Sequence, residues 1–299
     1  MNFPLKDRRT FLRNSIQVLG ALALPGSGFC QWAPVPLFAH LWVYASKYPP
    51  RWDAAPVLDQ AFADIKGAGF AGIELMAVNL EQDDAVGRIG KLVGKYELPV
   101  SGASFEANMW DRERHDAILQ DVVLLTGRLR ELGGRTFGLS VGDAGRKKTD
   151  AELEVQAATL NEILNICDKR NIIPNLHNHT YELRDGLYDL QETLRRVPEL
   201  RLGPDINWLI RGGVDPVAFI DTYGSRIGYL HLRDQHANGR WTEALGEGAT
   251  DFAAIARALR RVGFSGAAAV ELAYDAEPSR TTAQNWQISR NYMRRVFQW

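Results

Sequence analysis

The sequence predicts an α/β fold, a single (β/α)8 TIM barrel, from three features of its pattern. From Pro36 onward, short apolar runs alternate with longer amphipathic stretches, as repeated βα units do. The alternation continues through eight strands and eight helices, which favours a closed barrel over an open sheet. No G-x-G-x-x-G motif follows the first apolar run, which weakens a dinucleotide-binding alternative. Without a break in composition, residues 34–299 are expected to form one domain.

The expected strands are the short apolar runs, which are typical of parallel strands buried on both faces. In chain order they are Leu37–Trp42, Gly72–Leu75, Pro99–Phe105, Thr136–Val141, Ile172–His177, Leu200–Asp205, Ile227–Leu232 and Ala267–Glu271.

The expected helices lie between these runs and carry apolar residues on one face. The first, for example, has Val57, Phe62 and Ile65 at helical spacing. In chain order the helices are expected at Pro56–Gly67, Asp84–Lys95, His115–Leu132, Asp150–Arg170, Leu187–Arg196, Pro216–Tyr223, Phe252–Val262 and Thr281–Phe297.

Composition excludes some classes of function. The chain has 299 residues, of which 45% are hydrophobic and 24% charged, so it can build an ordinary globular core. Its 35 basic and 36 acidic residues give a net charge of −1, whereas nucleic-acid-binding proteins usually carry a basic excess. Only two cysteines are present, so disulfides are not expected to stabilise the fold. The expected partner is therefore a small molecule, not a nucleic acid, and a homo-oligomer is left open.

The N-terminus has the order of an export signal. A twin-arginine run, Arg-Arg-Thr-Phe-Leu-Arg at residues 8–13, precedes an apolar stretch at 15–24 and then small residues. The apolar stretch is shorter than the about 20 residues that span a bilayer, so no stable membrane insertion is expected. We interpret residues 1–33 as a cleavable signal of the twin-arginine pathway and the protein as periplasmic. The alternative is an amphipathic helix with an incidental arginine pair.

Polar side chains stand at the ends of four successive strands. In a (β/α)8 barrel these ends converge on one mouth, where active sites form. Side chains two residues apart on a strand share a face, so the two histidines after the fifth strand are expected on the same side. The residues are His177 and His179 after the fifth strand, Asp205 and Asn207 after the sixth, His231 and Arg233 on the seventh, and Glu271 on the eighth.

This mixed set of imidazoles and carboxylates predicts one divalent metal ion. Such ligands suit Mn, Co, Zn or Fe, whereas an all-oxygen set would indicate Mg or Ca. Singly, each residue has a simpler explanation: a histidine can be a hydrogen-bonded rim residue, and Asp205 can cap the next helix. Together, on four neighbouring strands, they favour the metal site.

Three further residues are candidates for the substrate pocket. Glu74 ends the second strand and either contacts the substrate, supports the site from behind or is structural. His40 and Trp42 on the first strand either line a sugar pocket or belong to the core. With Asn207 and Arg233, these residues make up the predicted substrate-binding set.

From about Leu37 to its end, the chain resembles the xylose isomerase-like superfamily, which includes sugar phosphate isomerases and epimerases, inosose dehydratases and endonuclease IV relatives. The resemblance is carried by a series of short motifs in order along the chain. They are Gly72–Leu75, His177–His179, Asp205–Trp208, Gly213–Pro216, Leu230–Asp234, Leu245–Gly248 with Asp251 and Phe252, and Val270–Glu271.

The resemblance implies a metal set of His177, Asp205, His231 and Glu271. Many members of the superfamily have glutamate where this chain has His177, and in the epimerases that glutamate and the last one form an acid/base pair. The difference places a two-carboxylate epimerase mechanism in doubt. With histidines on this strand, the chain also resembles the inosose dehydratase and keto-sugar branch. In that branch, proton abstraction beside a carbonyl can lead to β-elimination.

We therefore expect an enzyme that enolises a keto-sugar or keto-cyclitol, with the metal polarising the carbonyl. His179 or His177 would move the proton, with Glu271 as a second catalytic group. The first hypothesis is an isomerase or epimerase, and the alternative is a lyase or dehydratase acting on a 3-keto-glycoside or inosose. A second alternative is a non-catalytic periplasmic carbohydrate-binding barrel. An endonuclease IV-like activity is disfavoured, because the chain has only six histidines and no excess of basic residues.

Overall fold

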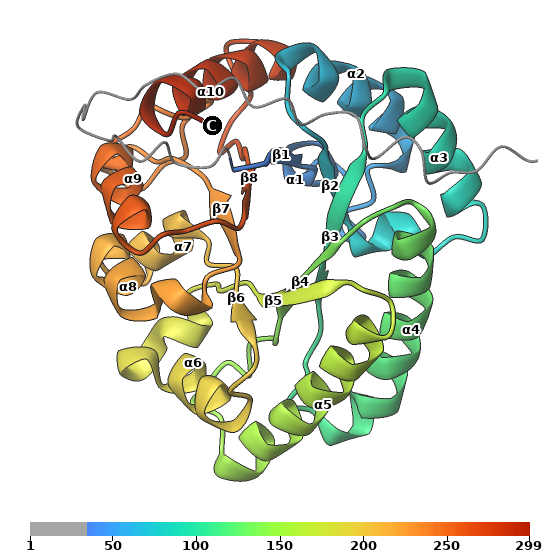
Figure 1. The fold of residues 1–299 in the computed structure, drawn as a ribbon, viewed down its shortest axis with the longest axis vertical. Helices are drawn as coiled ribbons and strands as arrows, with labels where there is room; N and C mark the ends of the chain where they lie inside the picture. Colours follow the sequence, from blue (N-terminus) through green and yellow to red (C-terminus); the bar gives the residue numbers. More distant parts are fainter. Residues whose placement is uncertain (1–34) are drawn as a thin grey trace, which may run out of the picture. The chain divides into compact units, whose positions relative to one another are not determined.

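The strands follow one another around a ring nearly in chain order (Figure 1). The computed structural model describes residues 35–299. Its eight-stranded sheet has the order β6-β5-β4-β3-β2-β1-β8-β7, and every pair is parallel. Isolated parallel bridges, Leu202 with Ile227 and Asp205 with His231, join β6 to β7 and close the ring. The predicted (β/α)8 barrel is confirmed. The strands are β1 (Leu37–His40), β2 (Ile73–Met76), β3 (Val100–Glu106), β4 (Thr136–Ser140), β5 (Ile173–Leu176), β6 (Arg201–Leu202), β7 (Tyr229–Leu232) and β8 (Ala267–Val270).

The helices form an outer ring around the strands (Figure 1). The longer ones are α2 (Leu58–Ala68), α3 (Ala85–Tyr96), α4 (His115–Glu131), α5 (Asp150–Asp168), α6 (Arg184–Arg196), α8 (Pro216–Tyr223), α9 (Phe252–Arg261) and α10 (Thr282–Val296). Two short helices, α1 (Trp42–Ala45) and α7 (Ile206–Arg211), follow β1 and β6 at the mouth. Single 3-10 turns occur at η1 (Ala55–Val57), η2 (Ala77–Leu80), η3 (Arg112–Arg114), η4 (Tyr181–Leu183) and η5 (Gly224–Arg226).

Two strands end two or more residues earlier than the sequence pattern predicts. The first ends at His40 rather than Trp42, because the His40 ring accepts the Trp42 backbone N–H at 3.2 Å and the chain turns into α1. The sixth is only Arg201–Leu202, since Pro204 has no N–H to donate to a ladder. Both early ends place loop and helix backbone at the mouth of the barrel.

Residues 1–33, the predicted signal, lie outside the described residues. Among residues 35–299, no helix combines the length and apolarity needed to cross a membrane.

Candidate active site

A cavity of about 190 Å³ lies at the carboxyl ends of the strands. The structure brings six of the predicted site residues to its wall: His40, Trp42, His177, His179, Arg233 and Glu271. Asp205 and His231 are each 0% exposed and belong to the same cluster, because the bridge between β6 and β7 pairs them. The cavity is therefore lined by the polar ends of several strands, as the fold predicts.

His231 is held by hydrogen bonds at both ring nitrogens. Its Nε2 lies 3.0 Å from Oε2 of Glu74, and its Nδ1 lies 2.9 Å from Nδ1 of His177. A carboxylate can only accept, so Nε2 carries the proton and Nδ1 carries the lone pair. That lone pair is directed toward His177, whose pKa burial lowers well below its usual range.

Glu74 lies behind His231 rather than on the cavity wall. Its carboxylate accepts from Ser104 Oγ at 2.7 Å, from Tyr229 Oη at 2.7 Å and from His231. Burial by itself would raise the pKa of Glu74, but its interaction with His231 outweighs burial and lowers the pKa to about 2. Glu74 is thus an ionised carboxylate whose contacts are all with the barrel, and it fixes the orientation of His231.

Asp205 serves two purposes in its position after β6. Its Oδ1 accepts the N–H groups of Asn207 at 2.7 Å and Trp208 at 3.0 Å, which caps α7. Its Oδ2 is buried and has no hydrogen-bond partner among residues 35–299. A buried carboxylate oxygen without a hydrogen bond is costly unless a cation lies near it, and Arg233 Nη2, at 3.6 Å, is such a cation.

Arg233 lies between the two carboxylates. Its Nη2 donates to Oε1 of Glu271 and lies 3.6 Å from Oδ2 of Asp205. Its guanidinium carbon is 5.6 Å from the ring of Trp208 and 5.0 Å from that of Trp241. The cation therefore partly offsets the charge of Asp205 and Glu271, and an aromatic surface lies beside it.

His40 completes the cluster from β1. Its Nε2 lies 2.9 Å from Ser104 Oγ, and its Nδ1 lies 3.6 Å from Oε2 of Glu271. Burial is the main reason that its pKa falls to about 3, so the ring is neutral. Ligand atoms of His40, His231 and Glu271 lie within 4.8 Å of one another. His40, expected as a substrate contact, is thus also placed to bind a metal.

His179 also lines the cavity, but its hydrogen bonds are made with residues outside the His40, His231 and Glu271 cluster. Its Nδ1 lies 3.1 Å from the hydroxyl of Tyr181, and that hydroxyl donates to Oε1 of Glu106 at 3.3 Å. Tyr181 has one proton to give, so it accepts from Nδ1–H, and the lone pair of His179 resides on Nε2. Burial lowers the pKa of His179, which keeps the ring neutral and able to accept a proton.

The remaining predicted residues occupy two different settings. Trp42 lines the cavity, with its ring centroid 5.5 Å from that of Trp52. Asn207 is 0% exposed; its amide nitrogen donates to Gln235 and its oxygen accepts from Trp241 Nε1, both at 3.0 Å. Asn207 therefore holds Trp241 in place from outside the cavity.

Sequence reasoning missed most of the aromatic wall. Trp52, Trp208 and Trp241 line the cavity, yet none stands at the end of a predicted strand. Trp208 was within reach, because it follows Asp205 in a motif already singled out. Trp52 and Trp241 lie in loops, where no periodicity indicates which way a side chain points.

The donor set fits a divalent metal ion. Ligand atoms of His40, His231 and Glu271 lie within 4.8 Å of one another, and Oδ2 of Asp205 accepts no hydrogen bond from residues 35–299. A metal-bound histidine usually donates its other N–H to a carboxylate, as His231 does to Glu74. The residues whose ligand atoms lie close enough to share one ion are His40, His231 and Glu271, with His177 and Asp205 beside His231.

A family model matches most of the chain. The chain belongs to the xylose isomerase-like TIM barrel family, whose model matches residues 62–296. A comparison with curated protein sequences finds no match.

Solved structures with the same fold are sugar-converting enzymes. A 3-keto-D-glucoside 4-epimerase from E. coli is 17% identical with a TM-score of 0.70, over 88% of this chain and 100% of that one. A D-allulose 3-epimerase from Methylomonas sp., solved with D-allulose, is 17% identical with a TM-score of 0.71, over 88% and 97%. A sugar phosphate isomerase/epimerase from Parabacteroides distasonis is 18% identical with a TM-score of 0.71, over 88% and 95%. At these identities the likeness shows the fold.

Proposed function

We propose that the protein is a metal-dependent isomerase or epimerase that enolises a keto-sugar or keto-cyclitol. One observation carries the proposal: His40, His231 and Glu271 bring ligand atoms within 4.8 Å of one another at the mouth of the barrel. His177 lies beside His231, and Oδ2 of Asp205 accepts no hydrogen bond from residues 35–299. The solved structures with this fold include two enzymes that epimerise sugars, which supports the same class of reaction.

The proposed cofactor is one Mn, Co, Zn or Fe ion held by His177, Asp205, His231 and Glu271. Imidazole and carboxylate ligands together suit these ions. When bound, the ion supplies charge that polarises a substrate carbonyl and stabilises the oxyanion that develops on it.

The proposed base is His179. Its Nε2 carries the lone pair, because Nδ1–H is engaged with Tyr181 and, through it, Glu106. Its lowered pKa keeps the imidazole unprotonated at neutral pH, so Nε2 can remove the proton beside the carbonyl. Glu271, on the cavity wall, is placed to return or relay a proton from the other side of the substrate.

The other wall residues orient the substrate. Arg233 presents donors to substrate oxygens and, as a fixed cation, favours an oxyanion over a neutral hydroxyl. Trp42, Trp52 and Trp208 offer flat apolar faces, on which the C–H surfaces of a sugar ring can pack. These contacts would exclude water while the enolate exists.

The lyase alternative is favoured by one specific feature, the histidine at position 177. If this position bears an imidazole ligand instead of a carboxylate, the site has no symmetric carboxylate pair to protonate either face of the enolate. An enolate that is not reprotonated can instead expel a β-substituent, which makes the product an unsaturated ketone.

A turnover assay separates the two reactions. The purified protein is incubated with 3-keto-glycosides, inososes and ketohexoses, and the products are identified by NMR. An isomerase or epimerase gives a product of unchanged mass, whereas a lyase releases a fragment or water. No product from any member of the panel would instead favour the non-catalytic carbohydrate-binding barrel.

A further inference from the structure

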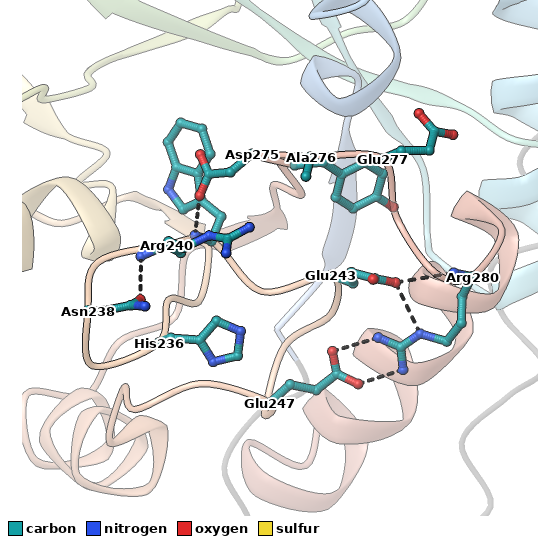
Figure 2. A pocket seen from close by; sticks show the side chains of 11 residues that line it. His236, Asn238, Arg240, Glu243, Glu247, Asp275, Ala276, Glu277 and Arg280 are labelled. Carbon is teal, nitrogen blue, oxygen red and sulfur yellow. Dashed lines mark hydrogen bonds and ion pairs between the residues drawn. The ribbon is translucent and has the colours of Figure 1, made fainter.

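The loops that follow β7 and β8 enclose a second cavity of about 290 Å³ (Figure 2). Its side chains come from residues 236–247 on one loop and residues 274–280 on the other. The labelled side chains of His236, Arg240 and Glu247 stand on the first loop, and Asp275 and Glu277 on the second. This outer pocket contains none of the proposed metal ligands.

Trp241 lines both the outer pocket and the inner cavity. Its indole N–H donates to Asn207 at 3.0 Å, and its backbone N–H donates to Oδ2 of Asp275 at 2.7 Å. The guanidinium of Arg211 lies 4.4 Å from its ring centroid. Trp241 is thus a rigid aromatic surface shared by the two spaces, held from both loops.

The chemistry of the outer pocket suits hydroxyl groups. Its most embedded cation, Arg280, is neutralised by Glu247, with contacts of 2.5 and 2.7 Å, and by Glu243 at 3.3 Å (Figure 2). Four carboxylates and two guanidinium groups line the pocket, which disfavours a phosphorylated or carboxylated ligand. The mixture of donors and acceptors beside an aromatic ring instead favours a neutral polyol.

Size is consistent with a ligand that occupies both spaces. Small-molecule sites usually enclose about 300–1,000 Å³. The inner cavity of about 190 Å³ is smaller than that, whereas the inner cavity and the outer pocket of about 290 Å³ together lie within the range.

We propose that the outer pocket binds a second sugar unit, so that the substrate is a keto-glycoside of at least two rings rather than a free monosaccharide. The ring that reacts lies in the inner cavity, and Trp241 supports the junction between the rings. The identity of the reacting ring rests on the proposed function, whereas the presence of a second sugar site does not.

The test is equilibrium binding, which needs no turnover. Calorimetry on the metal-loaded protein compares D-glucose with trehalose, maltose, cellobiose and sucrose, none of which has a ring ketone to enolise. At least one disaccharide is expected to bind about 10-fold or more tightly than glucose, because it reaches both pockets. If the protein does not enolise keto-sugars, this binding result is still expected. The two proposals can therefore be judged separately.

Variants locate the effect. Ala276, an exposed residue of the outer pocket, is replaced by Trp to fill it, and exposed Ala237, on the neighbouring loop but off the pocket wall, is replaced by Trp as the control. Ala276→Trp should remove the preference for the disaccharide and leave glucose binding as it was, whereas Ala237→Trp should change neither. The double variant Arg240→Ala, Glu277→Ala, which removes hydroxyl partners without filling space, should also reduce the preference.

Three results would overturn the proposal. They are equal affinity for glucose and every disaccharide, no binding of any disaccharide, or a preference that persists unchanged in Ala276→Trp and in the double variant.

Discussion

His177 and His179 lie two residues apart but meet different neighbours. His177 Nδ1 faces His231, among the proposed metal ligands, whereas His179 is tied to Tyr181 and Glu106. A ligating imidazole uses its lone pair and cannot accept a proton with it. The geometry therefore supports a division in which His177 binds the metal and His179 moves the proton.

Alanine at each position tests that division. His177→Ala should lose metal, measured by elemental analysis, and activity together. His179→Ala should keep its metal and bind the substrate but lose turnover by about 10²–10⁴-fold. If His179→Ala turns over as fast as the wild type, the base lies elsewhere, and Glu271 is the next residue to replace.

Glu74 gives a second test, because its carboxylate accepts the Nε2–H of His231 and fixes the orientation of that ring. Glu74→Gln should weaken metal binding by about 10–100-fold, since the amide orients and polarises the imidazole less than a carboxylate does. A titration with Zn or Mn in the presence of a competing chelator measures the change. The control is Glu131→Gln, an exposed position on α4. Unchanged metal affinity in Glu74→Gln would show that His231 does not act as a ligand supported by Glu74.

The strand-end pattern predicted which residues meet at this site better than it predicted what each one contacts. Asp205, His231 and Glu271 lie at or shortly after the carboxyl ends of β6, β7 and β8, a placement that the apolar runs predict. The position of Arg233 between Asp205 and Glu271 depends on side-chain rotamers across three strands. The role of His40 depends on the pairing of β1 with β8, the first and last strands along the chain. Neither is encoded in local sequence.

Helices were predicted well where apolar residues recur at helical spacing. Helix α5 begins at a capping box, in which Thr149 accepts from the N–H of Glu152 and the Glu152 carboxylate accepts from the Thr149 N–H. The sixth strand was overestimated, because the prediction followed the apolar run and gave no weight to Pro204, which cannot donate to the ladder. Helix α6 has three residues with positive φ at its start, Asp185–Leu187, so its regular part begins close to the predicted Leu187.

The capping box of α5 makes a prediction about stability and pH. The hydrogen bond from Arg146, followed by that from the Thr149 backbone, lowers the pKa of Glu152 to about 2. A lowered folded-state pKa stabilises the protein above the unfolded value of about 4.5, and the benefit disappears as pH falls toward 2. Glu152→Gln should therefore reduce the free energy of unfolding by up to about 1 kcal/mol at pH 7. Urea unfolding at several pH values measures the difference, which should shrink below pH 4.5; a difference that is constant with pH would contradict the assignment.

At the scale of the whole molecule, the alternation of strands and helices was sufficient to predict a closed barrel. The strict order constrains the topology, because parallel neighbours need a crossover helix and the crossovers are right-handed. The site then follows from the architecture, which directs all strand ends to one mouth. The outer pocket could not be predicted, since it is built by two loops of irregular backbone.

We propose in addition that the chain is exported to the periplasm by the twin-arginine pathway. The basis is the sequence alone, Arg8 and Arg9 ahead of a short apolar stretch. Replacing both arginines with lysine keeps the charge but removes the pair that the pathway reads, so the precursor should accumulate in the cytoplasm. Fractionation and immunoblotting follow the protein, with Lys6→Arg as the control. Normal export of the double variant would contradict the proposal.

Solvent-deuterium exchange into a keto-sugar, measured by NMR with and without metal, tests the central claim most directly. It reports removal of the proton beside the carbonyl whether the enolate is reprotonated or eliminates. The account predicts exchange at that carbon with the metal-loaded protein, loss of exchange after chelation, and recovery when Mn, Co, Zn or Fe is restored. Exchange that persists in the fully chelated protein, or no exchange with any keto-sugar or keto-glycoside under metal saturation, would contradict metal-assisted enolisation at this site.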